Sequence, residues 1–144
     1  MNISRLLRVL LTIILVISLV LIVVSEYRHD RKVEMMVKLS DASSSILVRL
    51  TNDELAYRTP EGRRLEHLVD PFLLENMDPA WTLAGENYES RVSLSFGENL
   101  ENTIGPFGPD RPEGEMANAL ACSVVAVIND RRLPAKLKVM VWEA

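Results

Sequence analysis

The strongest constraint on this chain is the absence of glycine and proline from its first 59 residues. All seven prolines and six glycines of the 144-residue sequence lie from Pro60 onward. Within the breaker-free part, Val9–Val24 is an uncharged apolar run, and a polar stretch follows it directly. Because glycine and proline are the residues that most disfavour helix interiors, the sequence predicts one long N-terminal helix.

The apolar run is long enough to suggest a membrane-spanning helix. Such a helix needs about 20 mostly apolar residues. Val9–Val24 supplies sixteen, and Arg8 can extend its charged end to the membrane interface. We therefore predict a short N-terminal tail over residues 1–8 and a transmembrane helix over residues 9–25. The alternative is a secretory signal peptide, because basic residues precede the run and small residues near Ser25 suit cleavage.

Charge is distributed unevenly along the chain. Residues 1–32 carry five basic and two acidic side chains, a net charge of +3, so the remainder of a chain of net charge −4 carries −7. An acidic C-terminal part argues against nucleic-acid binding, which requires clustered lysine and arginine. Basic residues flank the apolar run on both sides, so the positive-inside rule does not settle orientation. The many predicted strands and loops of the C-terminal part favour its placement outside the cytoplasm. We therefore expect a single-pass protein of the cell membrane with its head outside the cytoplasm.

Residues 26–50 are predicted to continue the helix as an amphipathic stalk. Val33, Met36 and Val37 recur at helical spacing, and Leu47 and Leu50 follow them. We expect this face to pack onto the C-terminal part, to contact neighbouring subunits, or to do both.

Residues 51–144 are predicted to form a small α+β head, in which the long helix packs on an antiparallel β-sheet. The head is expected to contain the following elements: a capping-box sequence at Thr51–Glu54 that either begins a short helix or ends the long one, a hairpin turn at Thr59–Gly62, a short helix over 72–77 begun by Asp70 and Pro71, strands over 88–96, 123–128 and 135–142, a loop over 105–114, and core contacts from Trp81 and Leu83.

The sequence contains no arrangement that indicates catalysis. Neither His29 nor His67 lies at metal-ligand spacing from other ligating residues, and no nucleotide-binding or hydrolase motif is present. The single cysteine, Cys122, lies in an apolar stretch and is expected to be a small core residue, the alternative being an intermolecular disulfide or a reactive thiol. We therefore predict a protein that is not an enzyme and has no cofactor, metal or small-molecule substrate. A secreted or anchored hydrolase would need a catalytic cluster that the sequence does not show.

The layout resembles the archaeal type IV pilin-like and pseudopilin-like proteins. The resemblance rests on the apolar helix that continues into a stalk, on the helix end SSSILVRLTNDELAYR, on the strand YESRVSLSF, and on the closing hairpin VVAVINDRRLPAKLKVMVWEA. It implies a structural subunit of a cell-surface filament or secretion-type assembly, with the lipid bilayer and other pilin-like or membrane subunits as its partners.

Two features decide which kind of pilin-like protein is expected. Proteins of this group carry glycine or alanine just before the apolar run, as part of the prepilin peptidase site, whereas the first alanine here is Ala42 and the first glycine is Gly62. Bacterial pilins also carry a glutamate near the start of the mature helix, and the run here holds no acidic residue. These features favour a permanently anchored accessory subunit over a processed major pilin. The alternative is a membrane-tethered binding module of a cell-envelope complex that does not polymerise. The residues expected to make interactions are Val33, Met36, Val37 and Phe107.

Overall fold

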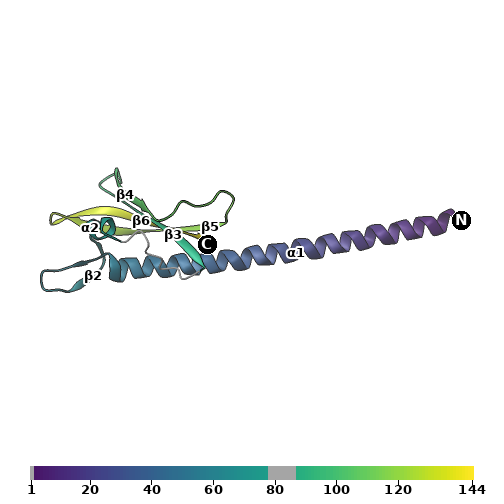
Figure 1. The fold of residues 1–144 in the computed structure, drawn as a ribbon, viewed down its shortest axis with the longest axis horizontal. Helices are drawn as coiled ribbons and strands as arrows, with labels where there is room; N and C mark the ends of the chain where they lie inside the picture. The colour runs from purple at the N-terminus through teal and green to yellow at the C-terminus, as the bar shows by residue number, and fades with distance from the viewer. Residues whose placement is uncertain (1, 78–86) are drawn as a thin grey trace. The chain divides into compact units, whose positions relative to one another are not determined.

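A computed structural model of the protein describes residues 2–77 and 87–144 (Figure 1). The chain forms two compact units, Met1–Met35 and Met36–Ala144. The second unit contains the C-terminal part of a long helix and a six-stranded sheet formed by the described residues. The predicted α+β class, with a long N-terminal helix packed on a mostly antiparallel sheet, is confirmed.

Helix α1 covers Ile3–Arg49, and a π-helical turn over Leu50–Glu54 continues it. This confirms the long helix expected from the absence of glycine and proline. Of the two roles expected for Thr51–Glu54, the segment ends the long helix and does not begin a new one. The Thr51 hydroxyl donates to the carbonyl oxygens of Leu47 and Val48, at 3.0 and 3.1 Å, so it belongs to the last turns of the same helix.

The C-terminal part of α1 packs on the sheet through one face. Leu39, Ser43, Ile46 and Leu50 are buried, and their spacing of three or four residues places them on one side of the helix. Leu50 is thus packed, as one of the two roles expected for the stalk face requires. Val33, Met36 and Val37 are each about half exposed, at 47, 58 and 54%, so they do not pack on the head, and their contact with neighbouring subunits stays a prediction.

Ser43 explains why the sequence does not show the N-terminal part of the buried face, Leu39 to Ile46. A serine in the middle of the stripe interrupts its apolar pattern, but a buried hydroxyl is tolerated when it is hydrogen-bonded. The Ser43 hydroxyl donates to the Leu39 carbonyl oxygen at 2.7 Å and accepts from the Asn118 side-chain amide at 2.7 Å. The second bond joins α1 to the sheet.

The sheet has the strand order β1-β2-β5-β6-β3-β4. Only the β2–β5 pair is parallel, and the other neighbours are antiparallel. In Figure 1 the strands lie together beside the blue, C-terminal part of α1. The strand bounds are β1 Ala56–Arg58, β2 Arg64–Val69, β3 Tyr88–Phe96, β4 Asn102–Phe107, β5 Ala117–Ile128 and β6 Arg131–Glu143.

Several local predictions are confirmed. β1 and β2 form the expected hairpin around Thr59–Gly62. The short helix α2, Pro71–Glu75, begins as expected, because the Asp70 carboxylate accepts a hydrogen bond from the Phe72 amide at 3.1 Å. The predicted core contacts of Trp81 and Leu83 lie outside the described residues.

Part of the predicted loop over 105–114 is instead the end of strand β4. Proline lacks a backbone donor, so it is tolerated on an edge strand, and β4 pairs with β3 alone. At the end of β4, Gly108 adopts a φ of +115°, and a Cβ atom there would lie 2.3 Å from the Ser90 carbonyl oxygen. Glycine is therefore required where the chain leaves this edge.

β6 is the central strand of the core, since it pairs with β5 on one side and β3 on the other. Its residues alternate: Ala135, Leu137, Val139 and Val141 are buried, whereas Lys136 and Lys138 are exposed. The buried set faces α1, because Asn118, which bonds Ser43, stands opposite Val141 in the β5–β6 register. One face of the sheet is therefore covered by the helix.

Candidate membrane-spanning surface

The N-terminal part of α1 exposes its apolar side chains in every direction. Each residue from Asn2 to Glu34 is exposed, and the large apolar side chains of Val9–Val24 have exposed fractions between 43 and 63%. By length and composition, this is the one helix among the described residues that could cross a membrane, and none of its apolar window is buried. The core helix of a water-soluble domain would instead bury such a window.

The dimensions of this segment match a bilayer. The uncharged run Val9–Val24 spans roughly 24 Å as an α-helix, and Leu6 and Leu7 extend the apolar surface to roughly 28 Å if Arg8 reaches the interface with its long side chain. The hydrocarbon core of a bilayer is about 30 Å thick. Thr12 is the first hydroxyl-bearing residue inside the apolar run, and its hydroxyl donates to the Arg8 carbonyl oxygen at 2.8 Å. This internal bond leaves the hydroxyl without a need for water.

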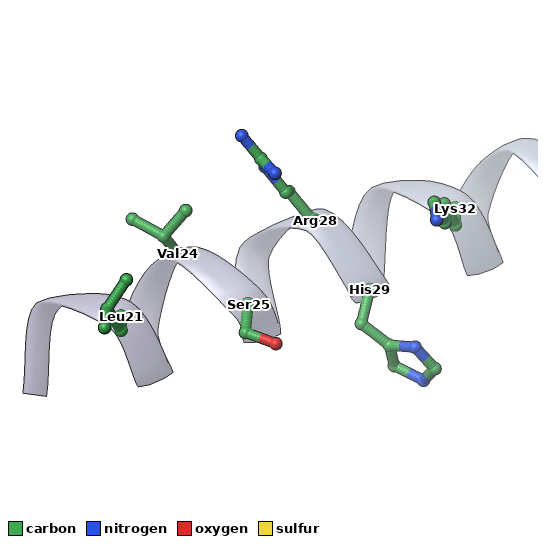
Figure 2. Close-up of a pocket in the computed structure, with 6 residues that line it drawn as sticks. All are labelled: Leu21, Val24, Ser25, Arg28, His29 and Lys32. Atoms are coloured by element: carbon green, nitrogen blue, oxygen red, sulfur yellow. The ribbon is translucent and has the colours of Figure 1, made fainter. Parts of the chain in front are cut away.

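A change from apolar to cationic side chains marks the end of this segment. Figure 2 shows this part of α1, with Val24 and Arg28 on one side of the helix and Ser25 and His29 on the other. Leu21 and Val24 are apolar, whereas Arg28 and Lys32, one and two turns further on, are basic.

Tyr27, which lies in the same part of α1, also suits a membrane interface. The Arg31 guanidinium lies 5.2 Å from the centre of the Tyr27 ring, a distance at which the cation is attracted to the ring face. Tyrosine and basic side chains are enriched where hydrocarbon meets lipid headgroups. The Tyr27–Lys32 segment therefore has the composition expected at one boundary of a bilayer.

The predicted interaction residues lie on two different elements. Val33, Met36 and Val37 share one exposed face of α1, since they are three and four residues apart. Phe107 is a half-buried residue of β4 and pairs with Val92, so it does not lie in the loop predicted over 105–114.

The titratable residues considered for chemistry do not form a cluster in the described part of the chain. His29 and His67 are both exposed, and no group of three His, Cys, Asp or Glu side chains is placed to hold a metal ion there. Cys122 is half-buried on β5. Desolvation raises the pKa of its thiol, so the neutral form predominates at neutral pH.

Arg91 and Lys138 line one depression on the sheet, and the sequence does not identify them as members of a common site. Their proximity depends on the register of β3 against β6, in which Ser93 stands opposite Lys138. Register between two strands far apart in sequence is not visible in either strand alone.

Comparison of the chain with protein-family models, with curated proteins and with solved structures finds no match.

Proposed function

We propose that this chain is a single-pass membrane protein that serves as a pilin-like structural or accessory subunit of a cell-surface assembly, with its head outside the cell. The observation that carries the proposal is the change in burial along α1. Exposed apolar residues occupy the helix as far as Val24, and a buried stripe begins at Leu39. One helix thus has a part suited to lipid or to other helices and a part that belongs to a folded head.

The exposed face formed by Val33, Met36 and Val37 supports assembly. Large apolar side chains about half exposed beside a membrane-spanning segment are suited to burial against a neighbouring subunit. In this proposal the apolar run contacts lipid while the subunit stands alone and contacts other helices in the assembly. The head contributes its sheet to the outside surface.

A second candidate function is a membrane-tethered binding module that does not polymerise. The observation in its favour is the composition of Val9–Val24, which lacks glycine and alanine. Close approach of membrane helices is favoured by small residues four positions apart, and the run holds no such pair.

Disulfide cross-linking in membranes distinguishes the two functions. Replacing Cys122 by serine removes the chain's single thiol, and Val37→Cys then places one on the exposed apolar face. Arg31→Cys in the same background is the matched control, because Arg31 is also exposed on α1 but lies about 120° around the helix from Val37. Assembly through the predicted face gives oxidised dimers with Val37→Cys and few with Arg31→Cys. Equal, weak cross-linking of both variants would reject assembly through this face and favour the tethered module.

A further inference from the structure

The face of the sheet that α1 does not cover carries a group of cationic side chains. On β6, residues of the same parity as Lys138 point away from the buried set, and on β3 the register places Arg91 and Ser93 beside them. Four cations therefore share this face: Arg91, Arg132, Lys136 and Lys138. This is unexpected in a chain whose residues from 33 onward carry a net charge of −7.

Two of these cations line a depression of about 260 Å³ on this face. The depression combines charge, hydroxyl groups and apolar surface, and its lining residues are Arg91, Ser93, Thr103, Pro106, Lys138 and Met140. Its volume is slightly below the range typical of drug-sized ligands, which begins at about 300 Å³. A site of this size accommodates a single acidic group together with its short stem.

Arg91 has hydrogen-bonding capacity that the described residues do not use. Its Nε atom is buried and has no hydrogen-bond partner among them, although a buried donor without a partner is costly. Its Nη2 atom lies 3.0 Å from a carboxylate oxygen of Asp110, a residue that is 92% exposed. Lys138 is exposed and forms no ion pair with the part of the chain that the structure describes.

We propose that this depression, the Arg91–Lys138 site, binds a carboxylate group presented by an acidic peptide segment of a partner protein. The guanidinium of arginine has a planar set of donors that matches a carboxylate, and Lys138 adds a second positive charge. Ser93 and Thr103 supply hydroxyl donors, and Met140 and Pro106 contact the aliphatic stem of the acidic side chain. The ion pair with Asp110 shows that the Arg91 guanidinium already binds one carboxylate group.

This arrangement makes Asp110 an internal competitor for the site. An exposed ion pair contributes little free energy, typically about 1 kcal/mol or less, so an incoming carboxylate can displace it. The inference concerns the head alone and does not depend on whether the apolar helix assembles or which side of a membrane the head occupies.

The test measures binding of a fluorescein-labelled peptide of alternating glutamate and serine to the full-length protein in nonionic detergent, by fluorescence anisotropy at about 0.15 M ionic strength, where the Debye length is about 8 Å. A peptide with glutamine at every glutamate position is the ligand control. Three variants are compared with the unsubstituted protein: Lys138→Gln, Asp110→Asn and Lys136→Gln. Lys136→Gln is the matched control, because it removes the same charge from the same face of β6 without touching the depression.

The proposal predicts opposite effects for the two site variants. Lys138→Gln weakens binding by about fivefold, the effect expected for one exposed charge contact, whereas Asp110→Asn strengthens binding because the competitor is lost. Lys136→Gln changes the affinity by less than about twofold, because its contribution is screened. All variants should retain the buried-tryptophan fluorescence of the folded protein, so a loss of binding cannot arise from unfolding.

Four results would overturn the proposal. The first is equal binding of the glutamine peptide. The second is an equal loss of affinity in Lys136→Gln and Lys138→Gln, which would indicate diffuse attraction to a positive face. The third is failure of the Asp110→Asn variant to bind the acidic peptide at all. Displacement of the peptide by an equal concentration of inorganic phosphate would also reject a site selective for carboxylates.

Discussion

Replacing Ile46 by alanine tests whether α1 supplies one side of the head's core. Ile46 is 2% exposed, and truncation of a buried isoleucine to alanine costs about 2–5 kcal/mol. Three lost carbon atoms account for about 2.4 kcal/mol of this at 0.8 kcal/mol each, and the cavity left behind adds to it. Alanine is the better helix former by a few tenths of a kcal/mol. We therefore expect the free energy of unfolding to fall by about 3 kcal/mol.

Val48→Ala is the matched control, because Val48 lies two residues away on the same helix and is 53% exposed. Its free energy of unfolding should change by less than about 0.5 kcal/mol. Both variants are measured as full-length protein in nonionic detergent by urea unfolding, followed by the fluorescence of Trp142, which is fully buried. Equal losses in the two variants, or a loss below about 1 kcal/mol for Ile46→Ala, would refute the packing of α1 on the sheet.

Three further predictions follow from single contacts. Ser43→Ala and Asn118→Ala should each lower the free energy of unfolding, and a double-mutant cycle should give a coupling of about 1 kcal/mol for their 2.7 Å hydrogen bond; additive losses would show that the bond does not form. Gly108→Ala should cost more than about 3 kcal/mol because the added Cβ meets the neighbouring strand, whereas Gly62→Ala, where φ is +84° and no atom lies within 4 Å, should cost about 1 kcal/mol; a smaller loss for Gly108 would contradict the geometry at the end of β4. Because burial raises its pKa, Cys122 should be alkylated slowly at neutral pH, with a half-maximal rate at higher pH than a cysteine peptide measured alongside; a midpoint at or below that of the peptide would contradict the burial.

The sequence predicts the α1 helix well and its packing poorly. Absence of glycine and proline over 59 residues is a local property, and it gives a helix that ends close to the predicted position. The packed face depends on Ser43, whose hydroxyl is satisfied by Asn118, 75 residues away. A polar residue in a buried stripe can be recognised only when its partner is known.

The sheet shows the same division between local and long-range information. Alternation in 88–96 and 135–142 correctly predicts β3 and the core of β6. β5 begins at Ala117, six residues before the predicted strand. Its first part is rich in alanine and has little intrinsic strand preference, so pairing with β6 extends it. β4 contains Pro106 and was predicted as loop because the sequence does not show that its outer edge is unpaired.

The residues of the Arg91–Lys138 site illustrate how a candidate site escapes sequence reading. Each lies on the polar side of an alternating strand, where charged residues are expected to be solvated. Only the register of β3, β4 and β6 brings the two cations, the hydroxyl groups and Met140 around one depression. The exposed apolar face of Val33, Met36 and Val37 could be found from the sequence, because its spacing lies within one helix.

The measurement that tests the central claim most directly is the intact mass of the native protein extracted from membranes, combined with protease accessibility of the head in whole cells. A membrane-anchored subunit with its head outside gives a full-length mass and a head that externally added protease removes. A mass smaller by about the first 25 residues would show that the apolar segment is a cleaved signal peptide and would contradict a permanent membrane anchor. A full-length mass with a protected head would keep the anchor but reject a head outside the cell.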